Sequence, residues 1–129
     1  MTLTYLDTSA VLKLVLDERE SDALVEALTA DRRLVASWLL HTEMHCAAGR
    51  HPEALHVEAI RAVLDTVDLV DLTRGDLLAA GTHAPLRSHD ALRLAVAIRV
   101  GVDEVVTYDD ALAAAAAGAG LVVLAPGTG

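Results

Sequence analysis

Four acidic residues have the type and placement that could hold a divalent metal: Asp7, Glu43, Asp90 and Asp109. Asp7 directly follows the run from Leu3 to Leu6, and Asp109 closely follows the run from Glu104 to Thr107, both of which favour β-strands. In an open parallel sheet, ligands bind beyond the carboxyl ends of the strands. We therefore expect Asp7 and Asp109 to lie at one edge of a sheet.

Glu43 and Asp90 fall within predicted helices, over residues 38–48 and 88–100. Glu43 follows Leu39 by four residues, and Asp90 precedes Leu94 by four, so each acid shares a helix face with apolar residues. Asp90 also lies near its helix N-terminus, where negative charge is favoured. Both carboxylates are expected to point toward the edge of the core.

Partly buried carboxylates that lie close together need positive charge, because desolvation and mutual repulsion disfavour their ionised forms. The chain has one lysine, Lys13, and the sequence offers few obvious arginine partners at these positions. A hard cation such as Mg²⁺ or Mn²⁺ takes oxygen ligands. We therefore predict a Mg²⁺ or Mn²⁺ site formed by Asp7, Glu43, Asp90 and Asp109, with no organic cofactor.

Each of these acids also has an ordinary structural interpretation when taken alone. Asp7 and Asp109 follow strands and are suited to cap the next helix. Asp90 fits the first turn of its helix, and Glu43 would face solvent if the helical phase were shifted by one position. The metal-site hypothesis therefore depends on all four acids together.

The elements that must position these acids alternate along the chain. Strands are predicted over residues 3–6, 34–36, 67–72, 104–107 and 121–124, with a loop over residues 65–71 as the alternative to the third strand. Helices are predicted over residues 10–16, 21–28, 38–48, 52–64, 77–84, 88–100 and 109–117. This alternation favours an α/β fold with a mostly parallel sheet covered on both faces.

Length and composition predict a single domain over residues 1–129, with residues 126–129 as a frayed tail. Hydrophobic residues make up 53% of the chain and aromatic residues only 2%, so the core is expected to be aliphatic. Cys46 is the single cysteine, and no leader segment or membrane-spanning run is evident. We expect a cytoplasmic protein without a membrane partner.

The motifs around the four acids resemble those of the PIN domain, and most of all the VapC-type toxins of bacterial toxin–antitoxin pairs. They are Leu3 to Ala10 (LTYLDTSA), the Glu43 helix, Ser88 to Leu92 (SHDAL) and Val105 to Leu112 (VVTYDDAL). The resemblance spans nearly the whole chain and implies a PIN-like three-layer α/β/α domain with about four to five strands. It also implies a Mg²⁺- or Mn²⁺-dependent endoribonuclease that cleaves an RNA substrate, forms a homodimer and is neutralised by a cognate antitoxin.

The resemblance assigns Asp7, Glu43 and Asp90 to the acidic core and Asp109 to the fourth position, with Asp110 as the alternative. Thr107 matches a hydroxyl residue that precedes the fourth acid in this family, so it is expected to orient a ligand. Arg87 and Arg93 flank Asp90 and are candidates for contact with RNA, although a solvated helix face is the favoured interpretation of both.

The formal net charge of −9 argues against a nucleic-acid enzyme, because phosphate binding normally rests on basic residues. Four metal-bound carboxylates would account for four of these charges, leaving −9 + 4 = −5. The remaining charge then requires a local basic surface, a partner subunit, or a weak and selective mode of RNA binding.

Other interpretations remain open at this point. His41 and His45 share a helix face and could bind zinc, but Glu43 points roughly opposite to them and does not match the zinc-protease spacing. A receiver-like signalling domain would need a lysine after a late strand, whereas Lys13 is in the first helix. A catalytically inactive PIN-like binding module is the third alternative.

Overall fold

The structure is a computed structural model that describes residues 1–29 and 31–128. Gly129, which belongs to the predicted tail, lies outside the described residues. The elements in chain order are β1 (Thr2–Leu6), α1 (Thr8–Val15), α2 (Ser21–Leu28), β2 (Arg32–Ser37), α3 (Trp38–Arg50), α4 (Val57–Leu64), β3 (Val67–Val70), α5 (Arg74–Ala80), α6 (Ser88–Val100), β4 (Glu104–Val106), α7 (Asp110–Gly118) and β5 (Val122–Leu124).

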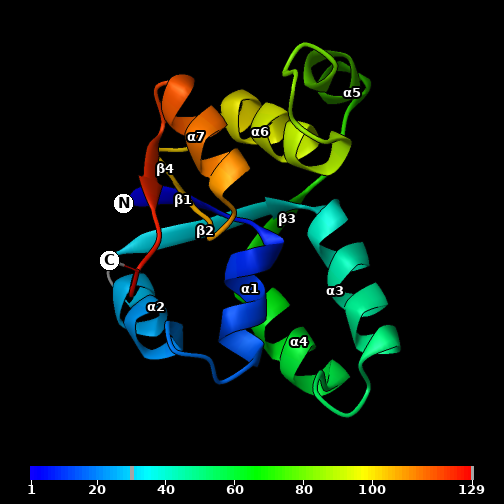
Figure 1. Cartoon of the computed structure of the whole chain (residues 1–129), viewed down its shortest axis with the longest axis vertical. Coiled ribbons are helices and arrows are strands. Elements are labelled where there is room, and N and C mark those ends of the chain that lie inside the picture. The colour runs from blue at the N-terminus through cyan, green and yellow to red at the C-terminus, as the bar shows by residue number, and fades with distance from the viewer. Residues whose placement is uncertain (30, 129) are drawn as a thin grey trace.

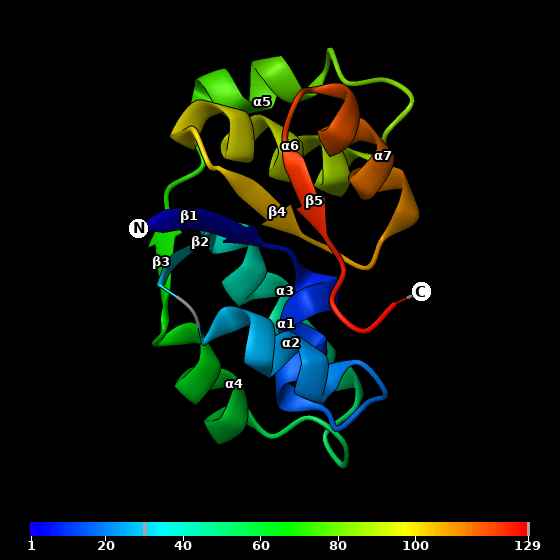
Figure 2. The same cartoon turned by 90° about the vertical axis from the view of Figure 1, so that its left-hand side faces the viewer.

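The five strands form one sheet in the order β3-β2-β1-β4-β5, and every neighbouring pair is parallel. Helices α1 to α4 cover one face of the sheet and α5 to α7 cover the other (Figure 1), and the turned view in Figure 2 shows the same two layers. The predicted three-layer α/β/α fold with a mostly parallel sheet is confirmed. The segment after residue 66 is a strand rather than a loop.

The core lies between the sheet and both helical layers and is almost entirely aliphatic, as the composition predicted. Strand residues Leu6, Val105 and Val106 are buried and pack with helix residues such as Met44 and Leu112. Parallel strands covered on both faces are expected to be apolar along their length. This continuous burial places the ends of β1 and β4 rigidly against the helices that follow them.

Two predicted helices have different boundaries in the structure. The helix predicted from Pro52 begins at Val57. Residues after His51 form a single turn that ends where Leu55 is buried in the core, and the extended backbone of His56 separates this turn from the helix. The helix predicted over 77–84 instead spans Arg74–Ala80.

The early start of α5 has a local cause. The Thr73 hydroxyl accepts a hydrogen bond from the Asp76 amide (3.0 Å), and the Asp76 carboxylate accepts one from the Thr73 amide (2.9 Å). This capping box fixes the helix start. The Thr-x-x-Asp spacing was visible in the sequence, and it identifies the correct boundary.

The end of the chain returns to the carboxyl edge of the sheet. The Tyr108 hydroxyl donates a hydrogen bond to the Pro126 carbonyl (2.8 Å), and the Thr128 amide donates to the Ala125 carbonyl (3.2 Å). Within residues 1–29 and 31–128, no helix is long and apolar enough to cross a membrane.

Candidate active site

The strand order reverses between β1 and β4, where parallel α/β sheets bind their ligands. The chain proceeds outward from β1 through β2 to β3, then returns to place β4 on the other side of β1. Asp7 follows β1 and Asp109 follows β4, so both acids lie at this switch point, as their sequence positions indicated.

Asp7 is the most buried of the four acids, with 3% of its surface exposed. One carboxylate oxygen accepts hydrogen bonds from the Ser9 hydroxyl (2.6 Å) and the Ala10 amide (3.0 Å). The other accepts one from the Thr107 hydroxyl (2.5 Å). Asp7 thus caps α1 while its carboxylate is fixed by groups from both sides of the switch point.

Burial raises the pKa of Asp7 above its usual value of 3.8, even though the hydrogen bonds from Ser9, Thr107 and Ala10 and the charge of Arg93 act to lower it. The folded chain therefore favours the neutral carboxyl. This contribution to stability is fully present below the unfolded-state pKa and is lost as the pH rises through the higher folded-state pKa. Above the unfolded-state pKa, keeping Asp7 ionised in the folded chain therefore costs stability.

We accordingly expect Asp7→Asn to unfold at a higher denaturant concentration than the wild type at pH 7 in the presence of EDTA. Asparagine keeps the size of the side chain and avoids the buried charge. The difference in free energy of unfolding should shrink as the pH falls toward 3.8, which urea titrations at a series of pH values would measure. A less stable variant at pH 7 would contradict this account of Asp7.

Two hydroxyl groups connect the β1 and β4 ends. Thr107 is 1% exposed, donates to Asp7 and accepts a hydrogen bond from the Asp109 amide (3.0 Å). Ser9 donates to Asp7 and accepts from the Tyr108 amide (2.9 Å). Thr107 had been predicted to orient a ligand, but the Ser9 contact was missed because it joins residues that are 99 positions apart.

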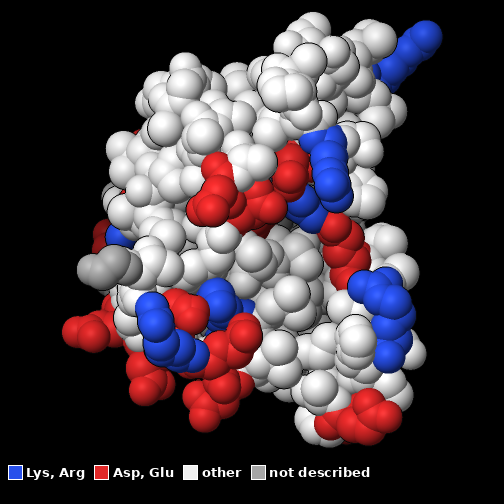
Figure 3. Space-filling view, in the orientation of Figure 1, with Lys and Arg blue, Asp and Glu red and all other residues white. Residues whose placement is uncertain are grey.

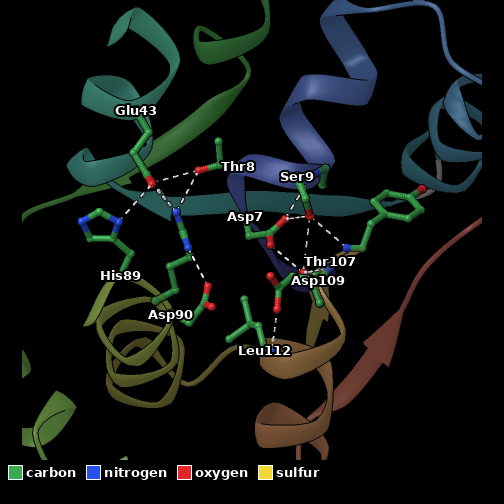
Figure 4. A network of polar contacts seen from close by, with 12 residues as sticks. Asp7, Thr8, Ser9, Glu43, His89, Asp90, Thr107, Asp109 and Leu112 are labelled. Atoms are coloured by element: carbon green, nitrogen blue, oxygen red, sulfur yellow. Dashed lines mark hydrogen bonds and ion pairs between the residues drawn. The ribbon is translucent and has the colours of Figure 1, made fainter. Parts of the chain in front are cut away.

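Glu43 lies on α3, and its carboxylate is directed toward the start of α1. The Thr8 hydroxyl donates a hydrogen bond to Glu43 Oε1 (2.8 Å), and His89 Nδ1 lies 3.8 Å from Glu43 Oε2. The Glu43 side chain is 20% exposed, so the prediction that it points to the core edge rather than to open solvent is confirmed. Figure 4 shows Glu43 on one side of Asp7 and Asp109 on the other.

Asp90 is joined to Glu43 by an arginine that the sequence interpretation had placed elsewhere. Arg93 Nη1 donates to Asp90 Oδ1 (2.7 Å), and Arg93 Nη2 donates to both oxygens of Glu43. The Arg93 side chain is only 11% exposed. The expected solvated helix face is therefore wrong for Arg93, as is the expectation of few arginine partners near the acids.

The cause is the phase of α6, which places Arg93 one turn after Asp90, where its guanidinium reaches Thr8 of α1 and Glu43 of α3. Burial alone would lower the pKa of Arg93, but its hydrogen bond to Glu43 and the charges of Glu43, Asp7 and Asp90 raise it above its usual value. Arg93 is therefore a permanent cation within the acidic group. Arg87, in contrast, is exposed.

A cavity of about 1190 Å³ opens beside this group. Its walls include Glu43, Asp90, Arg93 and Asp109 together with His83, Arg87 and His89. Asp110 is exposed and does not belong to these walls, so the structure directs Asp109 rather than its neighbour toward the cavity. Figure 3 shows acidic and basic side chains side by side in the middle of this face.

The donor chemistry of the four acids fits a hard divalent cation, since all of the available ligand atoms are carboxylate oxygens. Asp109 Oδ1 accepts a hydrogen bond from the Leu112 amide (2.9 Å), and Asp90 Oδ1 accepts one from Arg93, so one oxygen of each carboxylate is already engaged by the protein. Across the described part of the chain, no three His, Cys, Asp or Glu side chains already converge on one point that could hold a metal.

The two histidines of α3 lie away from this cavity. The His41 and His45 rings are stacked with centroids 4.2 Å apart, and His45 Nδ1 lies 2.9 Å from the His41 carbonyl oxygen. They line a separate hollow beside Trp38 and Arg61. The expectation that they face away from Glu43 is confirmed, and the structure gives no third ligand for zinc among the described residues.

The PIN domain family model matches residues 4–118, and the chain belongs to this family. It is similar over nearly its full length to Ribonuclease VapC46 of Mycobacterium tuberculosis, with 39% identity over 130 residues, 98% of this chain and 99% of that protein. Ribonuclease VapC35 of the same species is 35% identical over 134 residues, 97% of this chain and 98% of that protein. The predicted membership among VapC-type PIN domains is confirmed.

Solved structures with the same fold include VapC20 of Mycobacterium tuberculosis, a toxin that cleaves the sarcin-ricin loop. Its TM-score is 0.73 at 18% identity, and the match covers 95% of this chain and 99% of that one. A toxin–antitoxin complex from Klebsiella pneumoniae gives a TM-score of 0.71 at 19% identity, covering 95% and 97%. The family assignment excludes the receiver-like signalling domain.

Proposed function

We propose that this chain is the endoribonuclease toxin of a toxin–antitoxin pair and hydrolyses RNA phosphodiester bonds at the cavity beside Asp7, Glu43, Asp90 and Asp109. The observation that supports this most directly is that Glu43, Asp90 and Asp109 line one cavity, next to the switch point where Asp7 follows β1. The enzyme class is that of its relatives, which are named ribonucleases over nearly the same length.

Asp7, Asp90 and Asp109 would hold Mg²⁺ or Mn²⁺, with Glu43 completing the carboxylate set. When bound, the cation lowers the pKa of a water molecule and offsets negative charge on the phosphate. Ser9 and Thr107 fix the Asp7 carboxylate, and Thr107 also sets the backbone position of Asp109. Through these contacts, the two hydroxyls hold Asp7 after β1 and Asp109 after β4 in fixed positions relative to each other.

The cavity also offers groups suited to the RNA backbone. Arg87, His83 and His89 line the same walls as Asp90 and Asp109, so hydrogen-bond donors surround the acids locally although the chain carries a net charge of −9. Phosphate contacts from such groups position RNA without reading its sequence. The charge of Arg87 supplies part of the positive surface that the overall charge lacks.

A cleavage assay with two neighbouring variants tests the proposed function. Asp109→Asn should lower cleavage about a hundredfold or more, because it removes a charge that faces the reacting phosphate while an asparagine can still cap α7. Asp110→Asn is the matched control and should stay within about twofold, since Asp110 is exposed outside the cavity walls.

The wild type in this assay must first be freed of any co-purified protein. Absence of cleavage across diverse RNAs with Mg²⁺ or Mn²⁺ would overturn the proposed function and favour the catalytically inactive PIN-like binding module. Equal losses in both aspartate variants would instead contradict the assignment of Asp109 over Asp110.

The proposed partners are a cognate antitoxin and a second copy of this chain, in the cytoplasm. One structural neighbour is a toxin–antitoxin complex, and another is the VapBC2 pair from Rickettsia felis bound to a promoter DNA fragment. The surface of this chain exposes large apolar side chains that a partner could cover, including Trp38 at 47% exposure and Leu78 at 70%.

A further inference from the structure

Arg93 lies among the carboxylates that are proposed to bind the cation, and its guanidinium donates hydrogen bonds to three residues around it. Its guanidinium donates to Asp90 Oδ1, to both oxygens of Glu43 and to the Thr8 hydroxyl (3.2 Å). The planar fork of arginine is suited to bridging two carboxylates in this way. Figure 4 shows Glu43 of α3 and Asp90 of α6, the two carboxylates that this arginine joins.

Glu43 is largely saturated by these contacts. Its Oε1 atom accepts hydrogen bonds from Thr8 and Arg93, while its Oε2 atom accepts from Arg93 and lies near His89. A charge-assisted contact in a partly buried site is stronger than an exposed ion pair. A cation that takes Glu43 as a ligand must therefore replace hydrogen bonds that the protein already makes.

The charge of Arg93 adds a second effect. The guanidinium is a permanent cation, and a divalent ion that binds Asp90 or Glu43 directly would lie only a few Å from it. Two like charges at that separation repel, and the repulsion is weakly screened where solvent access is limited. Arg93 thus opposes cation binding both by occupying ligand atoms and by electrostatic repulsion.

We propose that Arg93 is an internal competitor of the divalent cation, which neutralises Glu43 and Asp90 and lowers the affinity of the site for Mg²⁺ and Mn²⁺. Cation binding through Glu43 then requires the guanidinium to leave that carboxylate. The cavity beside Arg93 provides the space for this movement. The inference rests on the proposed function only in assigning these acids to the metal site.

The experiment is calorimetric titration of the purified chain with Mn²⁺, without RNA, for wild type, Arg93→Met and Arg87→Met. Methionine keeps an unbranched side chain of similar length but removes the charge and the donors. Arg93→Met is expected to bind Mn²⁺ about tenfold more tightly or better. Arg87→Met removes an exposed arginine from the same cavity walls and should stay within about twofold.

Thermal unfolding gives an independent measurement. In EDTA, Arg93→Met should be less stable than the wild type, because Glu43 and Asp90 lose their counter-ion. Added Mn²⁺ should raise its melting temperature by more than it raises that of the wild type. A purely structural role for Arg93 would lower stability without this larger response.

Equal or weaker Mn²⁺ binding by Arg93→Met would overturn the proposal. If that variant fails to fold, Arg93→Lys replaces it: one ammonium cannot bridge both carboxylates, so tighter binding than wild type is still expected, and equal or weaker binding overturns the proposal. Neither measurement uses RNA. Failure of the ribonuclease proposal would appear separately, as absent cleavage with the cation affinities still in the expected order.

Discussion

Asp7→Asn is expected to cleave RNA at least about a thousandfold more slowly than the wild type at saturating Mn²⁺. Asparagine preserves the volume of the side chain and its hydrogen bond to the Ala10 amide, but it lacks the negative charge and one of the two acceptor oxygens. The loss would be measured as kcat/KM on a defined RNA, with the variant shown to be folded.

The control for this variant is Glu104→Gln. Glu104 is another buried carboxylate next to a threonine hydroxyl, that of Thr4 (2.9 Å), but it pairs with Arg32 and lies at the start of β4, the strand end opposite to Asp109. Its substitution should leave cleavage per folded molecule within about twofold. Full activity of Asp7→Asn would show that cleavage does not require the Asp7 carboxylate.

Removal of divalent cations is expected to abolish cleavage completely. Glu43, Asp90 and Asp109 line the cavity, where Arg93 pairs with only the first two, and an RNA phosphate adds a further negative charge. This repulsion must be offset before the phosphate can approach the acids. Dialysis against EDTA should therefore reduce cleavage to background, and Mg²⁺ or Mn²⁺ should restore it.

Monovalent salt at the same ionic strength is the control for this experiment, because it screens charge without supplying a ligand for the carboxylates. It should not restore cleavage. Circular dichroism in EDTA should show that the chain remains folded. Sustained cleavage after exhaustive chelation would mean that these acids work without a cation, and the proposed chemistry would be wrong.

The destabilising burial of Asp7 and the bridging role of Arg93 belong to one electrostatic arrangement. Asp7 is held in its place by Ser9, Thr107 and the α1 backbone, although burial disfavours its charge. Arg93 offsets part of the negative charge of the same group. A site that keeps several carboxylates close together is therefore stabilised by hydroxyls and a guanidinium before any ligand contributes.

The sequence by itself determined the fold class, the family and the approximate location of the four acids. These features depend on local patterns, because strand ends, helix faces and the order of short motifs can be read within about ten residues. Asp7 and Asp109 follow strands in the structure as they do in the pattern, and Glu43 and Asp90 share faces with core residues. The helix predicted to start at residue 77 starts at Arg74, and the cause, the capping box of Thr73 and Asp76, was readable in the local sequence.

Only the tertiary structure decided which side chains meet across the switch point. Arg93 reaches Glu43 from 50 positions away, and Thr107 reaches Asp7 from 100 positions away. The choice of Asp109 over Asp110 for the cavity depends on how α7 leaves β4. Such contacts follow from the order and register of parallel strands joined by long crossovers, and no local periodicity encodes them.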